Sequence, residues 1–202
     1  MQSILPRRIL LSLYNTMFLP HINYCLLSWG KDNDNILRLQ KKAIRAISSS
    51  EYLAHTEPLF KDLNILKIND IYDYKMLIFY HNLSNNNVPL YFKSFIPKHS
   101  QGNHRYTFRN PKYQLPKYEH VYIKLTCRYQ LPHILNQYMT TDLHDNVDNQ
   151  QAQYLSFLLN NISNLSLISF KYSVKSYFIN KYSCECTIAN CYICQLYSVS
   201  SI

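Results

Sequence analysis

Glycine is nearly absent from this sequence, with two residues in a chain of 202. This scarcity excludes the P-loop, the GxGxxG dinucleotide loop and the GxSxG nucleophile turn, because each needs closely spaced glycines. Charged residues are also scarce, at 16% against about a quarter in average proteins. Acidic residues are scarcer than basic ones, with 12 Asp and Glu against 21 Lys and Arg, which gives a formal net charge of +9. We therefore expect anionic partners.

Uncharged residues fill the segment 9–29, which contains no Asp, Glu, Lys or Arg and is long enough to span a bilayer. Polar residues, among them Asn15 and Pro20, interrupt it where the bilayer core would lie. We therefore predict a buried helical hairpin that breaks at Pro20, with core residues Tyr24, Leu27 and Trp29. The chain is then expected inside the cell, in the nucleus or cytoplasm, with no membrane partner. A secreted protein, or one anchored in a membrane by residues 9–29, is the alternative.

Hydrophobic periodicity predicts a mainly α (α+β) fold. Helices are expected over 3–30, 33–50, 68–84 and 152–182, the last with buried apolar residues that run from Leu155 to Phe178. Prolines and alternating residues predict a small irregular β segment around 103–130. We expect three parts: a helical domain over 1–87, a mixed segment with a C-terminal helix over 88–182, and a Cys-rich tail over 183–202.

Two basic segments are candidate nucleic-acid-binding surfaces. The helix over 33–50 should bury Ile36, Leu39, Ala43, Ala46 and Ile47 on one face. Another face carries four cations at helical spacing that can meet successive phosphates, namely Arg38, Lys41, Lys42 and Arg45. The segment 101–130 contains six basic residues and a single acidic one. Aromatic side chains such as Tyr113 lie between the basic residues and can stack on unpaired bases. The cations chosen from this region are Arg105, Arg109, Lys112 and Arg128.

The tail has the only metal-like spacing that we identify. Four thiols occur within 11 residues, and four thiolates satisfy tetrahedral Zn²⁺. They are Cys184, Cys186, Cys191 and Cys194. The short loop between the two pairs is unfavourable for zinc, so an unligated tail is the alternative, and we assign no other cofactor. Asp32 and Asp34 come nearest to a catalytic pair of carboxylates, but their place at the start of a predicted helix indicates that they cap it. We therefore assign no catalytic residue.

Three runs of residues resemble, in order and spacing, the segment after the catalytic palm in LINE-type non-LTR retrotransposon reverse transcriptases. The first joins Tyr14-Asn15 to 19–25 and Trp29-Gly30, the second is 39–45, and the third joins 52–56 to 58–60. Two later elements resemble the same family: Arg128-Tyr129 with Leu131-Pro132 and Asn136, and the helix 170–178. The resemblance covers about residues 3–182, although Leu135 stands where the family usually has Trp.

The resemblance implies a helical, thumb-like bundle that grips the RNA or DNA backbone of a template–primer. The palm is missing, because the sequence has no Tyr-x-Asp-Asp or Phe-x-Asp-Asp to hold the two Mg²⁺ ions of a polymerase. We therefore expect a truncated, non-catalytic remnant, which a separate polymerase chain could complete. Without the palm, exposed apolar surface should cause aggregation or dependence on a partner. A decayed reading frame with no selected function is the alternative.

Overall fold

The computed structural model describes residues 5–29, 34–96, 98–99, 112–117, 123–124, 126–139 and 149–182. These residues are mostly helical, which confirms the mainly α prediction. The one β pairing within them is an isolated antiparallel bridge between His99 and Tyr113. The described residues form two compact units. The first unit comprises 5–26, 34–71 and 178–182, and the second comprises 27–29 and the described residues between 72 and 177.

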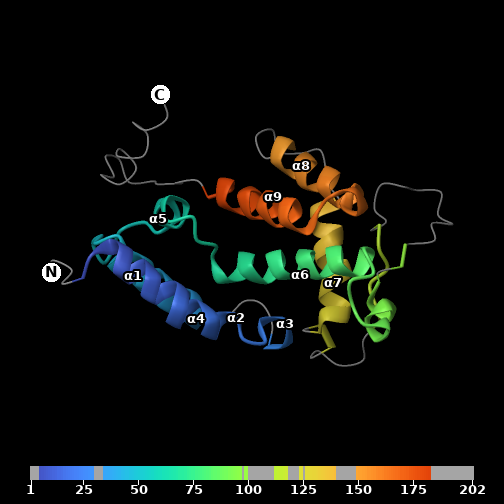
Figure 1. Cartoon of the computed structure of the whole chain (residues 1–202), viewed down its shortest axis with the longest axis horizontal. Coiled ribbons are helices and arrows are strands. Elements are labelled where there is room, and N and C mark those ends of the chain that lie inside the picture. Colours follow the sequence, from blue (N-terminus) through green and yellow to red (C-terminus); the bar gives the residue numbers. More distant parts are fainter. Residues whose placement is uncertain are drawn as a thin grey trace. The chain divides into compact units, whose positions relative to one another are not determined.

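The first unit begins with a continuous helical stretch made of α1 (Arg7–Leu13), the π-helical turn η1 (Tyr14–Phe18) and α2 (Leu19–Asn23) (Figure 1). The predicted break at Pro20 is therefore wrong. Proline has no N–H and clashes with the carbonyl four residues earlier in an α-helix. The wider π turn before Pro20 accommodates it without ending the helix.

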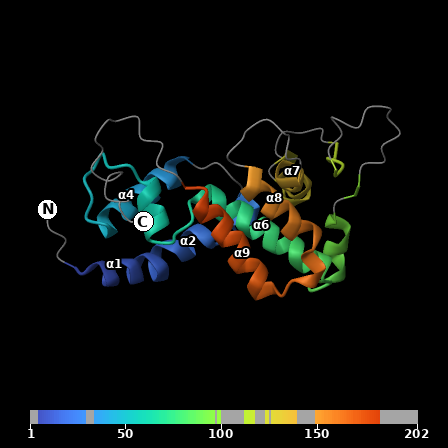
Figure 2. The same ribbon diagram turned by 90° about the horizontal axis from the view of Figure 1, so that it is seen from above.

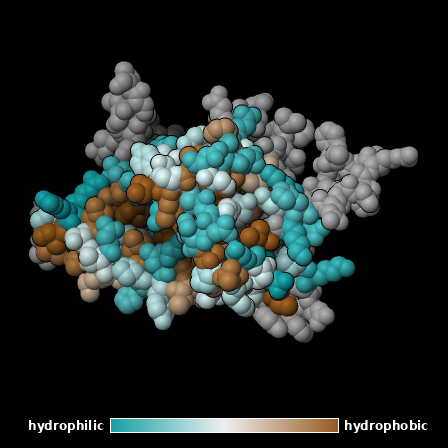
Figure 3. Space-filling model, turned by 45° about the vertical axis from the view of Figure 1, so that its right-hand side comes forward, coloured by the Kyte–Doolittle hydropathy of each residue, from teal (hydrophilic) through white to brown (hydrophobic). Residues whose placement is uncertain are grey.

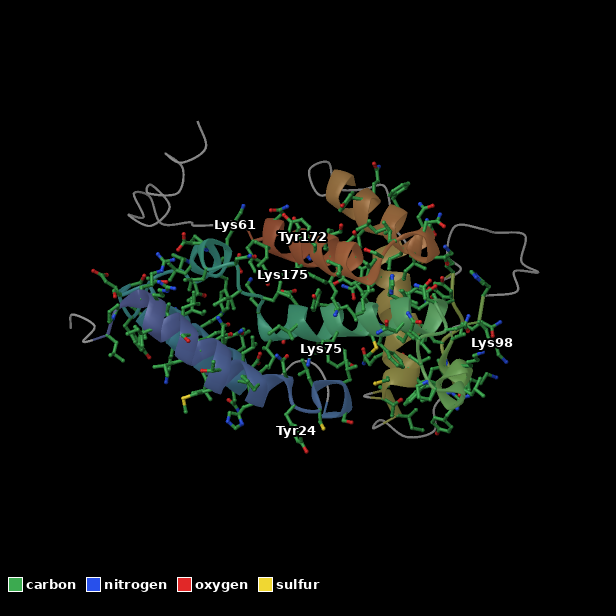
Figure 4. All side chains as sticks on the ribbon, viewed as in Figure 1. Tyr24, Lys61, Lys75, Lys98, Tyr172 and Lys175 are labelled. Carbon is green, nitrogen blue, oxygen red and sulfur yellow. The ribbon has the colours of Figure 1, made fainter. Side chains whose placement is uncertain are left out.

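The helical stretch ends instead at Tyr24 and Cys25. Cys25 has a φ of 48°, in the left-handed region, and the chain turns there into α3 (Leu26–Trp29). The prediction that Tyr24 is a core residue is wrong, because its side chain is 76% exposed and projects away from the helices (Figure 4). Leu26 is buried in its place and Leu27 is half-buried, while the Trp29 side chain lies outside the described residues.

Helix α4 (Asp34–Ile47) packs against α1 and against α5 (Glu57–Asp62). The predicted apolar face of α4 is partly wrong: Leu39 and Ala46 are exposed, and the buried residues are Gln40, Ile44 and Ile47. The prediction missed this face because a periodicity count leaves a glutamine out of the core. The helix ends where Ser50 N–H reaches back to the Arg45 carbonyl, a C-terminal cap that needs the left-handed φ of 52° at Ser49.

Helix α6 (Ile68–Ser84) has the predicted bounds, and the division between the two units falls within it, after Ile71. Its C-terminal cap uses the asparagines that follow, since Asn86 has a φ of 57° and Asn87 N–H bonds to the Asn82 carbonyl. The apolar pattern predicts an inner face of Ile68, Ile71, Tyr72, Ile78 and Phe79, which is partly wrong, because Ile78 and Phe79 are only half-buried. The buried side chains of the helix are Ile68, Ile71, Tyr72, Asp73, Met76, Leu77, His81 and Leu83.

The second unit continues from α6 into the 3-10 helix η2 (Leu90–Phe95) and then α7 (Cys127–Met139), which packs against α8 (Asn149–Asn160) (Figure 2). The prediction that residues near Cys127 form an alternating β segment is wrong, because they begin α7. Ile123, Cys127 and Leu131 also repeat every four residues, so the same apolar pattern fits a helix. Residues 103–111, 118–122 and 125 of that predicted β segment lie outside the described residues.

The predicted helix over 152–182 is divided into α8, the 3-10 turn η5 (Ile162–Asn164) and α9 (Leu167–Asn180). Its predicted apolar residues are nevertheless almost all in the core. Those that are buried are Leu155, Leu158, Leu159, Ile162, Phe170, Val174 and Phe178, while Leu165 is half-buried. His81 of α6 contacts the end of η5 and α9, since its Nε2 donates to the Leu165 carbonyl at 2.9 Å and its ring lies on Phe170.

On the face that Figure 3 shows, hydrophobic side chains, drawn in brown, lie between hydrophilic ones. Within the described ranges, no helix combines the length and the hydrophobicity that crossing a bilayer requires.

Candidate nucleic-acid interface

Gln40 fixes the orientation of α4 in the first unit. Its fully buried amide donates to the Tyr14 hydroxyl at 2.9 Å and to the Leu66 carbonyl at 2.8 Å. Its carbonyl oxygen accepts from Ile68 N–H at 3.0 Å, so it satisfies one of the N–H groups that the first turn of α6 leaves without a helical partner. One side chain thus connects α4 to η1 and to the start of α6.

Arg45, predicted as a phosphate contact, has a structural role as well. Its Nε donates to the Ala54 carbonyl at 2.9 Å and holds the turn that precedes α5. The turn then enters α5, where Pro58, Leu59 and Phe60 are buried. Tyr14-Asn15 and 19–25 of the first run that resembles reverse transcriptases therefore lie in the first unit with the second and third runs, where Tyr14, Gln40 and Arg45 connect them, whereas Trp29 of the first run belongs to the second unit.

The face of α4 opposite Gln40 and Ile44 carries the predicted cations. Arg38 and Lys42 are exposed, and Lys41 and Arg45 are half-buried. Among the described residues, no carboxylate pairs with Arg38, Lys41 or Lys42. At 1.5 Å per residue, Arg38 and Arg45 lie about 10 Å apart along the helix axis. We call these four cations the α4 basic face.

The second predicted basic segment is only partly described. Arg105 and Arg109 lie outside the described residues, as do Cys184, Cys186, Cys191 and Cys194 of the predicted zinc site. Lys112 is exposed, and its Nζ donates to Asn160 Oδ1 at 2.8 Å. Tyr113 was expected to stack on bases, but it is only 4% exposed, and burial together with the Tyr80 hydroxyl raises its pKa. It therefore supports the fold and is not an accessible stacking surface.

Asn136 of α7 holds the backbone of Tyr113 on both sides. Its Oδ1 accepts from Tyr113 N–H at 2.8 Å, and its Nδ2 donates to the Tyr113 carbonyl at 2.9 Å. The amide thus pairs with one residue as a neighbouring β-strand would. This pair fixes the extended segment 112–117 against α7, whose first turn carries Arg128.

Arg128 lies on a pocket that the sequence analysis missed. The pocket belongs to the second unit, is open to solvent and has a volume of about 540 Å³. Lys98 and Lys117 line it together with Arg128. These three cations are spread over 31 positions of the sequence, and no periodic pattern connects them. Only the fold around Tyr113 and Asn136 brings them together. We call this site the basic pocket.

Titration and metal ligation add little to either site. Burial lowers the pKa of Lys75 on α6 and of Lys175 on α9, both of which belong to the second unit (Figure 4). Neither lysine lines the basic pocket. In the part of the chain that the structure describes, no group of three or more His, Cys, Asp or Glu side chains is placed to hold a metal ion.

Comparisons of the chain with protein-family models, with curated proteins and with solved structures give no match.

Proposed function

We propose that this chain is a non-catalytic, thumb-like segment of a LINE-type reverse transcriptase that binds the phosphate backbone of an RNA–DNA template–primer through the α4 basic face. The observation that carries the proposal is the arrangement of α4. One face is fixed by buried Gln40 and Ile44, and the other carries Arg38, Lys41 and Lys42, which have no carboxylate partner among the residues that the structure describes.

The energetics favour backbone binding over base reading. Each lysine or arginine that neutralises a phosphate releases condensed counterions, which gives affinity without sequence preference. Long cationic side chains on a fixed helix can reach phosphates, and phosphate contacts carry no sequence information. We therefore expect contact with RNA or DNA backbone at many sequences.

The remaining parts of the proposal follow from the sequence resemblance. A polymerase chain that carries the palm aspartates would supply the chemistry, and the chain itself would act as a binding part. We propose an intracellular location, in the nucleus or cytoplasm, because a template–primer is found there. The Cys-rich tail remains a candidate zinc site, tested by metal analysis of the purified chain.

The experiment is binding of the full chain to a short RNA–DNA duplex across a salt series. The variant replaces Arg38, Lys41 and Lys42 with Gln and keeps Arg45, because Arg45 also holds the Ala54 carbonyl. Glutamine removes the charge and keeps a good helix former in α4. If these side chains contact phosphates, the slope of log affinity against log salt becomes shallower by about two to three units in the variant.

The matched control replaces Lys93, Lys171 and Lys181 with Gln. All three are exposed, and the substitutions lower the net charge by the same three units. The proposal requires the control to keep the wild-type slope. Equal slopes in the wild type and the α4 variant, or equal losses in the α4 variant and the control, would exclude the α4 basic face as the interface.

A further inference from the structure

The basic pocket concentrates positive charge without a counter-charge. Lys98, Lys117 and Arg128 line it, and no Asp or Glu is among the described residues of its lining. Within the described ranges, these three side chains also form no ion pair or side-chain hydrogen bond. Cations gathered on a concave surface raise the local concentration of an anion more than the same cations spread over a convex surface. The pocket therefore favours an anionic ligand.

The rest of the lining indicates what else the ligand carries. Phe95, Pro116 and Pro132 supply an apolar wall beside the cations. Three further aromatic rings support Phe95, whose centroid lies 5.6 Å from Phe92, 6.1 Å from Tyr91 and 6.5 Å from Phe79. The pocket volume of about 540 Å³ lies within the range of about 300–1,000 Å³ that small-molecule sites occupy. An inorganic phosphate would leave the apolar wall and most of this volume unused.

Hydrogen bonds within and behind the lining hold the segments of the pocket together. Gln114 N–H donates to the Lys98 carbonyl at 2.9 Å, which connects two of its sides. The amide of Asn136 holds Tyr113 and so joins the segment of Lys117 to α7. The Tyr80 hydroxyl meets the Tyr113 hydroxyl at 3.1 Å and joins the same segment to α6. Binding to a site that is already formed has a smaller entropic cost, because fewer side chains and segments have to be ordered.

We propose that the basic pocket binds a nucleotide. Lys98, Lys117 and Arg128 hold its phosphate, and its base lies against the apolar wall that includes Phe95. An aromatic ring and two prolines give this wall an apolar surface against which a planar base can lie, and bases stack on aromatic side chains whatever their sequence. The nucleotide is either free in solution or an unpaired residue of a single strand.

This site is separate from the α4 basic face, which belongs to the other unit. Backbone binding by α4 needs only phosphates, whereas the pocket needs a phosphate and an accessible base. A paired duplex hides its base faces and is not a ligand for the pocket. The two proposals can therefore fail independently.

The experiment measures binding of AMP, adenosine and inorganic phosphate to the full chain by calorimetry. The pocket variant replaces Lys98, Lys117 and Arg128 with Gln, and the control is the Lys93, Lys171, Lys181 to Gln variant described above. We expect AMP to bind at least tenfold more tightly than adenosine or phosphate. We expect the pocket variant to lose at least tenfold in AMP affinity while the control stays within about twofold of wild type, because only the pocket cations touch the phosphate.

A Phe95→Ala variant tests the apolar wall, because loss of stacking weakens AMP and leaves phosphate binding unchanged. A competition arm uses a short single-stranded oligonucleotide. Displacement of AMP by the strand at lower concentration identifies the strand as the source of the nucleotide, and displacement only by mononucleotides identifies the free nucleotide. Both results support the proposal. An α4 variant that loses the duplex and keeps AMP would show that the two sites are distinct.

Four results would overturn the proposal. Equal affinity for AMP and phosphate would leave a simple anion site, and equal affinity for AMP and adenosine would remove the role of the cations. Equal losses in the pocket variant and the control would indicate general electrostatic attraction. A phosphoserine peptide that displaces AMP at equal concentration would replace the nucleotide with a phosphopeptide as the ligand.

Discussion

The side-chain amide of Gln40 donates a hydrogen bond to the Tyr14 hydroxyl, 2.9 Å away, inside the first unit. The two residues belong to different helices and to different sequence runs of the family resemblance. With Leu66 and Ile68, they form a polar network in which the Gln40 side chain is fully buried. Buried networks of this kind stabilise a fold only when their members are satisfied.

We predict that Gln40→Leu lowers the free energy of unfolding by about 2–4 kcal/mol, because it leaves the Leu66 carbonyl and Ile68 N–H buried without their partner. Tyr14→Phe removes one bond of the network and should cost about 0.5–1.5 kcal/mol. Chemical denaturation followed by circular dichroism measures both. Leu39→Gln, on the adjacent exposed position of α4, is the control and should stay within about 0.5 kcal/mol of wild type. A Gln40→Leu variant as stable as this control would contradict the role of the network.

Asn136→Leu should destabilise the second unit by about 2–3 kcal/mol, because the N–H and carbonyl of Tyr113 both lose their partner. The same substitution should weaken AMP binding at the basic pocket, because the segment that carries Lys117 is no longer held against α7. Denaturation and calorimetry measure the two effects on one sample. Gln137→Leu, at the exposed neighbouring position, should change neither.

The sequence predicted those features that depend on neighbouring residues. The bounds of α6 follow from its apolar spacing and from the asparagines whose left-handed conformation ends it. The buried residues of α8 and α9, such as Leu155 and Phe170, follow from helical periodicity. The cations of the α4 basic face were found in the same way, because they repeat along one helix.

The features that were missed depend on residues far apart in the chain. Gln40 is polar, so a count of apolar periodicity excludes it from the core. It can be buried because three residues distant in the sequence satisfy its hydrogen bonds. The left-handed turn at Cys25 moves Tyr24 to the surface, and nothing in its neighbours indicates this. The basic pocket is assembled by the pairing of Asn136 with Tyr113, which brings together Lys98 and Arg128.

Alkaline pH should destabilise the first unit through Tyr182. Its hydroxyl donates to Asp70 and accepts from Lys67 N–H, and burial together with the charge of Asp70 raises its pKa. Below about pH 10 the tyrosine is neutral in both the folded and the unfolded chain. Above that pH the unfolded chain loses the proton and the folded chain keeps it, so the free energy of unfolding falls as pH rises.

We expect Tyr182→Phe to lower stability at pH 7, because Asp70 and Lys67 N–H lose a partner, and to make the fall above about pH 10 shallower. Urea denaturation from pH 7 to pH 11 measures both effects. Tyr172→Phe is the control, since Tyr172 is 77% exposed and its loss should change neither stability nor its pH dependence. A Tyr182→Phe curve parallel to wild type above pH 10 would exclude Tyr182 as the source of the alkaline loss.

The N-terminal helical stretch, together with Leu5 just before it, carries a row of exposed apolar side chains at four-residue intervals, namely Leu5, Ile9, Leu13 and Met17, each between 41% and 63% exposed. Residues four apart lie on one side of a helix, so the row is continuous. Contiguous exposed apolar surface favours association. We predict that the sedimentation coefficient of the chain rises with protein concentration, and that a Leu13→Lys, Met17→Lys double variant reduces this rise.

The added charges of that variant require a control with the same net charge. Ile168→Lys with Tyr172→Lys adds two positive charges at exposed positions of α9 and leaves the N-terminal row intact. If association occurs through the row, this control should associate as wild type does, because it leaves the four apolar side chains of the row unchanged. Equal suppression in both variants would attribute the effect to charge alone, and a wild-type chain that stays monomeric at every concentration would show the row to be inert.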